Sequence, residues 1–152
     1  NPGFESGVIT PWTSTSGVLK PNGTYPAHSG NWLARLDGRS GTHTDTLSQK
    51  VAISKTWTSA TFQFYLQIRS NDPTTNAKAW DTLKVQVLSS SGTVLKTLAT
   101  YSNKNTRNSY FKHSFSLNSY LGKTIILKFT GKETLTKHNT AFLVDDNALI
   151  AS

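Results

Sequence analysis

Apolar and polar residues alternate through much of the chain in the way that β-strands require. In residues 61–68 the side chains of Phe62, Phe64, Leu66 and Ile68 fall on one face, and such alternation is the signal of a half-buried strand. Further strands are predicted at residues 83–88, 94–100, 111–117, 124–129 and 141–144. The segments 124–129 and 141–144 are more continuously apolar, as strands buried on both faces are.

Turn-forming residues separate these strands. They include Pro21-Asn22-Gly23, Ser29-Gly30-Asn31, Asp37-Gly38, Asn71-Asp72-Pro73 and Tyr120-Leu121-Gly122, which combine glycine, proline and asparagine as turns do. Residues 89–93 are predicted to form a hairpin loop, and 118–121 a single helical turn. The spacing of strands and turns predicts an all-β antiparallel sandwich or barrel. A length of 152 residues predicts one domain, 1–152.

Composition limits the chemistry available to the chain. It has no cysteine, which excludes disulfides and thiolate metal sites. It also lacks methionine, so we expect it to be a piece excised from a longer precursor. The sequence has no run of 18 apolar residues, the length that would indicate a transmembrane helix. The net charge of +8 favours acidic partners. Because the lysines and arginines are dispersed, nucleic acid is an unlikely one.

The two ends of the chain carry matching chemistry. The first residues, Asn1-Pro2-Gly3-Phe4-Glu5, place an acid after a glycine turn, and Asp145 and Asp146 close the apolar run 142–144. Three of the eight acidic residues therefore lie in these terminal motifs. With Trp12 shortly after the first motif, this pairing resembles the galactose-binding-like family of β-sandwiches.

Several interior segments extend the resemblance over nearly the whole chain. They are His28-Ser29-Gly30-Asn31-Trp32, residues 42–49, 81–87, 91–95, 100–103 and 127–131, and Val144-Asp145-Asp146. These segments are similar to ones in accessory domains appended to bacterial secreted peptidases, and the wider galactose-binding-like group also occurs on secreted glycoside hydrolases. The resemblance implies an antiparallel jelly-roll β-sandwich without catalytic activity, secreted with a parent catalytic domain.

The resemblance also implies a structural calcium ion that ties the two ends together. Its ligands would be the carbonyl of Gly3, the carboxylate of Glu5, a carbonyl near Asn31, and Asp145 or Asp146. Calcium takes six to eight oxygen ligands, among them carboxylates and backbone carbonyls. Alternatively, these acids cap turns or pair with lysine and arginine, and alternation does not choose between the two aspartates.

The remaining candidates for catalysis are weak. Asp45 and Asp81 each precede Thr-Leu and are interpreted as buried polar groups bonded to His43 or to threonine hydroxyls. A carboxylate pair for glycoside hydrolysis is the alternative. The four histidines, His28, His43, His113 and His138, lack the local spacing of zinc ligands, although a site assembled in three dimensions stays open. We therefore predict that the chain is not an enzyme.

Aromatic and basic residues in two long loops, 69–80 and 101–110, are the best candidates for binding a ligand, because loops carry the function of a sandwich. The predicted ligand-binding residues are Trp57, Arg69, Trp80, Tyr101, Lys104, Arg107 and Tyr110. Aromatic rings stack on sugar faces, and the basic groups can bond to an anionic polymer. The aromatics of the loops could instead pack at a sheet edge, and Trp12 and Trp32 are expected in the core.

These observations favour a module that holds a secreted hydrolase on an extracellular polysaccharide, a cell-wall glycan or another anionic polymer. The alternative is a protein-interaction domain that docks substrate for a secreted peptidase.

Overall fold

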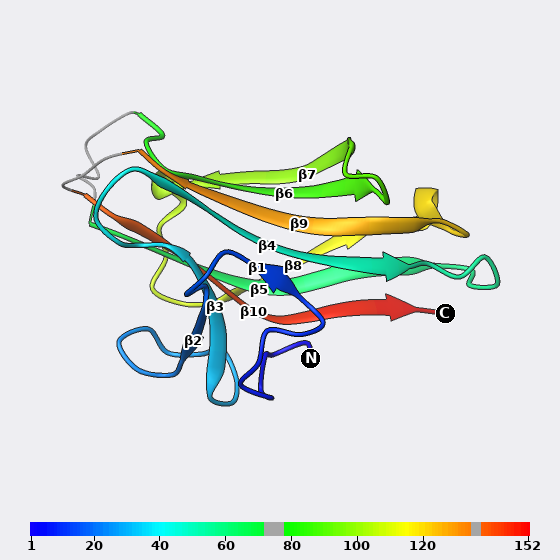
Figure 1. Ribbon diagram of the computed structural model, residues 1–152, viewed down its shortest axis with the longest axis horizontal. Helices are drawn as coiled ribbons and strands as arrows, with labels where there is room; N and C mark the ends of the chain where they lie inside the picture. The colour runs from blue at the N-terminus through cyan, green and yellow to red at the C-terminus, as the bar shows by residue number, and fades with distance from the viewer. Residues whose placement is uncertain (72–77, 135–137) are drawn as a thin grey trace.

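The computed structural model describes residues 1–71, 78–134 and 138–152. Two five-stranded antiparallel sheets face each other (Figure 1). One sheet has the order β1-β4-β9-β6-β7 and the other β2-β3-β10-β5-β8. The strands are β1 (Thr13–Ser14), β2 (Leu19–Pro21), β3 (Trp32–Asp37), β4 (His43–Ala52), β5 (Ala60–Ser70), β6 (Thr82–Ser89), β7 (Val94–Ser102), β8 (Phe111–Ser116), β9 (Thr124–Glu133) and β10 (Thr140–Ala151).

The predicted all-β jelly-roll sandwich is confirmed, and each predicted strand lies within or largely within an observed one. The side chains of Phe62, Phe64, Leu66 and Ile68 are all buried, as their alternation predicts. The predicted helical turn is the 3-10 helix η2 (Asn118–Tyr120), and a second, η1 (Asn103–Asn105), follows β7. Within the described ranges, no helix is long and apolar enough to cross a membrane.

β10 lies inside its sheet, paired with β3 on one side and β5 on the other. Its alternate residues Phe142 and Val144 belong to the main core between the sheets. On the outer face, Leu143 packs with Leu33 and Ala141 beneath side chains that include Tyr110. Both faces of the strand are therefore covered, which explains its continuous apolar sequence.

The first and last segments of the chain lie side by side. The backbone N–H of Asn147 donates to the carbonyl of Pro2 at 3.0 Å. The indole N–H of Trp12 donates to the carbonyl of Asn1 at 3.3 Å, and its ring packs against Phe4 with centroids 5.8 Å apart. Core packing and backbone pairing thus hold the N-terminal segment against the middle of β10, where its pairing with β5 shifts register.

Phe129 of β9 is the aromatic centre of the main core. Its ring meets Phe64 edge-on at a centroid distance of 5.0 Å, Phe62 at 6.0 Å and Trp12 at 6.5 Å. One residue therefore joins strands of both sheets to the N-terminal segment.

Replacing this ring tests the packing argument. Phe129→Ala should lower the free energy of unfolding by about 3–5 kcal/mol, because it removes buried surface and leaves a cavity. Ile150→Thr, at a side chain that is 50% exposed on β10, should change it by less than about 0.5 kcal/mol. Urea denaturation of both variants measures the difference, and similar losses would contradict the assignment of Phe129 to the centre of the core.

Candidate functional site

A groove of about 520 Å³ lies beside η1, where β7 of one sheet approaches β8 of the other. Leu66 and Ile68 of β5 line its apolar part, and Tyr101, Phe111 and His113 contribute rings. The other lining residues are polar or basic: Lys104, Asn105, Thr106, Arg107 and Lys112. The groove thus combines rings with three basic side chains, and none of its lining residues within the described part of the chain is acidic.

A hydrogen bond between the two sheets closes one side of the groove. The Tyr101 hydroxyl lies 2.8 Å from Nδ1 of His113. Burial raises the pKa of Tyr101 to about 12, so the phenol keeps its proton and donates it. Burial, and then the positive charge of Arg107, lower the pKa of His113. A neutral imidazole that accepts at Nδ1 is the consistent state.

Local capping places the basic residues at the mouth of the groove. The Ser102 hydroxyl accepts from the backbone N–H of Lys104, and Asn105 bonds back to the backbone N–H of Ser102, which is a reciprocal capping arrangement. The backbone N–H of Arg107 donates to the carbonyl of Ile68 at 2.9 Å. Its guanidinium carbon lies 4.1 Å from the ring centroid of Phe111, so a cation–π contact orients this charge.

Trp80 is joined to the same corner through η1. Its backbone N–H donates to the side chain of Asn103 at 3.0 Å, and the Asn103 amide donates to the carbonyl of Lys78. The ammonium of Lys78 lies 4.0 Å from the Trp80 ring centroid. The structure therefore brings Tyr101, Lys104 and Arg107 into one groove with Trp80 tied to its border.

The other predicted ligand-binding residues lie elsewhere. Arg69 and Tyr110 belong to the outer face of the second sheet, where Arg69 lies over the ring of Tyr25 at 5.9 Å. The Tyr110 hydroxyl donates to the carbonyl of Pro26 at 2.9 Å, and burial raises its pKa. Trp57 packs against the main core between β4 and β5, at the far end of β5 from the groove. Part of the predicted loop 69–80, residues 72–77, falls outside the described residues.

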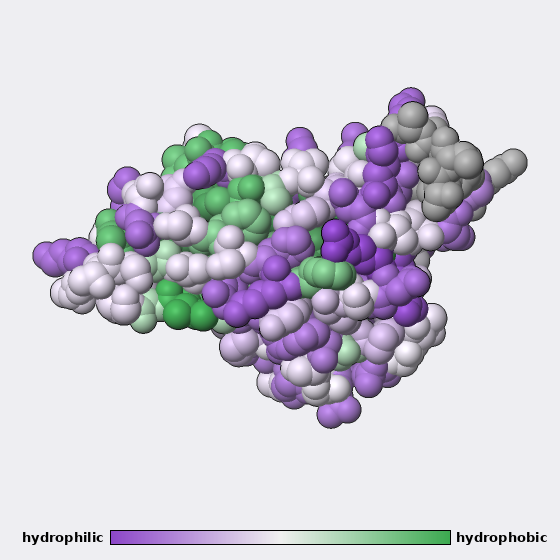
Figure 2. All heavy atoms as spheres, turned by 180° about the vertical axis from the view of Figure 1, so that it is seen from behind, coloured by the Kyte–Doolittle hydropathy of each residue, from purple (hydrophilic) through white to green (hydrophobic). Residues whose placement is uncertain are grey.

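Phe111, Lys112 and His113 are groove residues that sequence reasoning missed as ligand contacts. Their segment was predicted as an ordinary strand, and Phe111 is 41% exposed at its start. An exposed phenylalanine beside a basic loop is the signal that could have identified it. Figure 2 shows the face of the molecule opposite to the one seen in Figure 1. Apolar side chains are gathered over part of this face, and hydrophilic side chains surround them.

The terminal acids all meet the segment 28–32. The Glu5 carboxylate accepts from the backbone N–H groups of Asn31 at 2.7 Å and Trp32 at 3.0 Å. Asp145 accepts from the backbone N–H of His28 at 2.8 Å. Asp146 contacts His28 Nδ1 at 2.6 Å, and the Ser29 hydroxyl donates to it at 2.9 Å.

Gly3 completes this terminal cluster. A Cβ placed on Gly3 would lie 2.9 Å from Oδ1 of Asp146 and 3.6 Å from Oδ1 of Asp145, so only glycine fits without displacement. Asp145 is completely buried, and burial raises its pKa to about 6. The carbonyl of Asn31 already accepts from the N–H of Asn22 at 2.7 Å. The predicted residues thus come together, and the donors now satisfying them are N–H and O–H groups.

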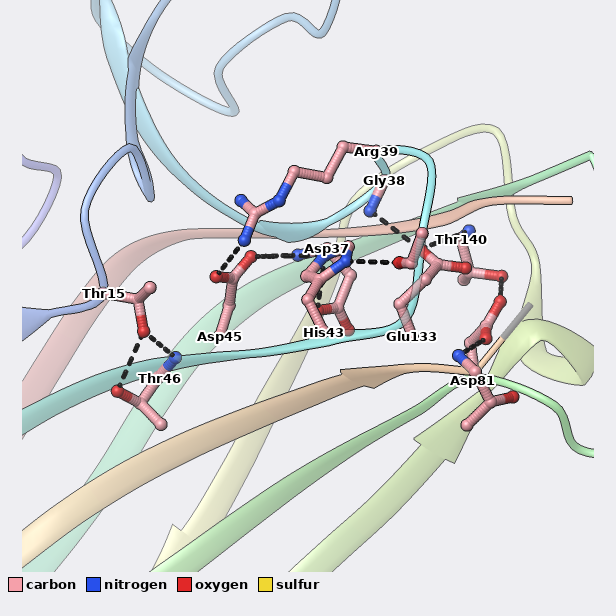
Figure 3. Close-up of polar contacts among 12 residues, drawn as sticks. Thr15, Asp37, Gly38, Arg39, His43, Asp45, Thr46, Asp81, Glu133 and Thr140 are labelled. Atoms are coloured by element: carbon pink, nitrogen blue, oxygen red, sulfur yellow. Dashed lines mark hydrogen bonds and ion pairs between the residues drawn. The ribbon is translucent and has the colours of Figure 1, made fainter. Parts of the chain in front are cut away.

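Asp45 and Asp81 are buried polar residues, as predicted. Both are completely inaccessible, which leaves no surface on which a glycosidic bond could reach them. The Thr140 hydroxyl donates to Asp81 at 2.8 Å, and the Arg39 guanidinium donates to Asp45 at 2.9 Å. They belong to a larger polar cluster at one end of the sandwich (Figure 3).

Comparison with solved structures supports the fold. The carbohydrate-binding module TmCBM61, solved in complex with beta-1,4-galactotriose, aligns over 100% of this chain and 96% of its own, with a TM-score of 0.68 and 16% identity. A family 16 carbohydrate-binding module aligns over 99% of this chain and 96% of its own (TM-score 0.59, 17% identity). The CBM22-1 xylan-binding domain of Paenibacillus barcinonensis Xyn10C aligns over 98% and 90% (TM-score 0.54, 14% identity).

These neighbours share the β-sandwich architecture at identities that establish the fold alone. No protein-family model matches the sequence, and neither does any curated protein.

The protonation of His113 makes the stability of the fold depend on pH. Because its pKa is lowered from 6.5 in the folded protein, the unfolded chain binds more protons, and His113 stabilises the fold less as the pH falls below about 6.5. His113→Gln, which retains an acceptor for Tyr101, should remove this contribution. Urea denaturation from pH 8 to pH 5 measures the unfolding free energy of both proteins. As the pH falls, the wild type should lose more of this free energy than the variant does. Parallel curves would contradict the assignment.

Proposed function

We propose that the chain is a non-catalytic carbohydrate-binding module that anchors a secreted hydrolase to an extracellular polysaccharide. The fold shared with several carbohydrate-binding modules supports this function. The single observation that carries it is the groove beside η1, in which exposed ring surface and basic side chains lie together. Secretion and a parent catalytic domain belong to the same proposal and follow from the sequence resemblance.

The groove favours an acidic glycan. Sugar rings offer apolar faces to Tyr101 and to the free face of Phe111, while carboxylate groups would meet Lys104, Arg107 and Lys112. Among the described residues that line the groove none is acidic, so the charged side chains that they offer to a ligand are all basic. Charge-assisted hydrogen bonds to carboxylates are about twice as strong as neutral ones, and three basic groups therefore bias selection toward uronic-acid polymers.

A structural calcium ion at the terminal cluster is the second part of the proposal. Glu5, Asp145 and Asp146 supply the hard oxygen atoms that calcium prefers, and Gly3 leaves room beside the two aspartates. The raised pKa of buried Asp145 supports a cation here, because a nearby positive charge would offset the cost of burial. The ion would stabilise the contact between the N-terminal segment and β10.

Affinity electrophoresis tests the glycan proposal. Polygalacturonate should retard the protein more than neutral galactan or xylan, because the groove is cationic. Arg107→Ala and Lys104→Ala should each weaken binding about tenfold, the expected loss of one hydrogen bond to a charged group. Lys50→Ala, at an exposed lysine of β4 outside the groove, should leave the affinity unchanged.

Two outcomes would overturn the glycan proposal. Absence of retardation on every neutral and anionic glycan would favour the protein-docking function instead. Equal retardation by double-stranded DNA, with a steep salt dependence and equal losses in the Lys50 and Arg107 variants, would indicate non-specific polyanion binding.

Thermal denaturation tests the calcium proposal. After treatment with EDTA, adding calcium at about 100 times its Kd should stabilise the fold by about 2.7 kcal/mol and raise the Tm by several degrees. Glu5→Gln and Asp145→Asn should abolish this increase, since each removes a ligand charge. If the carboxylates serve only to hold the backbone of 28–32, both variants will lower the Tm and calcium will have no effect on the wild type.

A further inference from the structure

A second cluster of acidic residues lies between the two sheets and is formed by residues other than those of the terminal cluster. His43 and Asp45 occupy one face of β4, opposite Glu133 and Gly131 of the neighbouring strand β9. Asp37 ends β3 of the other sheet and reaches toward them (Figure 3). Since Gly131 has no side chain, the Asp37 carboxylate fits against it: a Cβ there would lie 2.5 Å from Oδ2 of Asp37.

The Asp37 carboxylate has no hydrogen bond although it is completely buried. Neither Oδ1 nor Oδ2 has a partner, and the side chain is 0% exposed. The nearby backbone N–H of Asp45 lowers the pKa of Asp37 only slightly and does not meet hydrogen-bond geometry. Burial, and then the charges of Asp45 and Asp81, raise this pKa to about 8. A buried carboxyl group without hydrogen-bond donors is either protonated or needs a positive charge beside it.

His43 is oriented as a metal ligand would be. Its Nδ1 lies 2.6 Å from the carbonyl oxygen of Gly41, which can only accept, so Nδ1 carries a proton. The other nitrogen, Nε2, points at the acids, 3.4 Å from Oδ1 of Asp37 and 3.8 Å from Oδ2 of Asp45. It is buried and has no hydrogen-bond partner. A histidine that binds a metal through one nitrogen commonly donates the other N–H to a backbone carbonyl in this way.

The separations suit one small cation. Ligand atoms of Asp37, His43 and Asp45 all lie within 4.8 Å of one another, and in the described part of the chain no other group of three or more acidic or histidine side chains does so. Ligands bonded to zinc at 2.0–2.1 Å in a tetrahedron are about 3.3 Å apart. The observed spacing therefore needs only small side-chain movements to place an ion among the three atoms.

The charge of the cluster suits a dication. Asp37, Asp45, Asp81 and Glu133 are all completely buried, and the Arg39 guanidinium bonds to Asp45. When ionised, Asp37 and Asp45 carry two negative charges, and the guanidinium of Arg39 supplies one positive charge beside them. A divalent cation at this place would therefore meet a net negative charge.

We propose that Asp37, His43 and Asp45 form a binding site for a divalent transition-metal ion, with Zn²⁺ the best fit. One imidazole nitrogen and two carboxylates match zinc, whereas calcium prefers oxygen ligands alone. Glu133, whose Oε1 is also buried without a partner, is the nearest candidate for a fourth ligand. Because Asp37 comes from one sheet and His43 and Asp45 from the other, the ion would cross-link the sandwich. This site is independent of the proposed glycan binding.

Titration of EDTA-treated, untagged protein tests the site. We expect Zn²⁺ to bind with one high-affinity site and to raise the Tm, and Co²⁺ in its place to give visible absorption bands of a tetrahedral nitrogen–oxygen site. His43→Gln and Asp37→Asn should each weaken Zn²⁺ binding at least about tenfold. His138→Gln, the matched control at another half-buried histidine, should bind like the wild type.

The two site variants separate binding from folding. Asp37→Asn removes a buried charge that no hydrogen bond satisfies, so its Tm without metal should equal or exceed that of the wild type, while the zinc-dependent increase disappears. The proposal is wrong if Zn²⁺ does not raise the Tm of the wild type, or if His43→Gln retains the increase. In that case a protonated His43 paired with Asp37 is the arrangement that balances the cluster, and His43→Gln will lower the Tm equally with and without zinc.

Discussion

The burial of carboxylates is the physical constraint on which this structure depends. Five of its eight acidic residues, Asp37, Asp45, Asp81, Glu133 and Asp145, are completely buried, in a chain whose net charge is +8. Burying a charge is costly unless it is paired or hydrogen-bonded. The donors to these carboxylates include backbone N–H groups, the hydroxyl of Thr140 and the guanidinium of Arg39, whereas the Asp37 carboxylate accepts no hydrogen bond.

The acids gather at two places where separate segments must be joined. At the terminal cluster, Glu5 and Asp145 hold the backbone of 28–32 against the ends of the chain. In the second cluster, Asp81 and Glu133 bond to β10 through Thr140, while Asp45 accepts from the backbone N–H of Asp37 at the end of β3. The five buried acids lie outside the groove beside η1, whose described lining residues carry basic but no acidic side chains, and this separation of charge underlies the proposed preference for an acidic glycan.

Much of the fold could be predicted because alternation reports directly which side of a strand is buried. β5, β6 and β9 followed from it. The strand β4 was not predicted, because it is largely polar along its length, with Asp45 as well as Leu47 directed inward. Within the candidate groove, Tyr101, Lys104 and Arg107 were predicted from loop composition. Phe111 was not, because a single exposed ring at the start of a strand carries no distinct pattern.

The sequence by itself determined the strand content, the sandwich class and the pairing of acidic motifs at the two ends, because these depend on local periodicity and on residue types. Only the tertiary structure decided that His43 Nε2 faces Asp37 across the interface between the sheets, and that Arg69 and Tyr110 lie on a different face from Tyr101. Such neighbours come from strands far apart in the chain, and their contact depends on sheet order and register. A shift of one residue in register turns every side chain to the other face, so no local pattern could have specified these contacts.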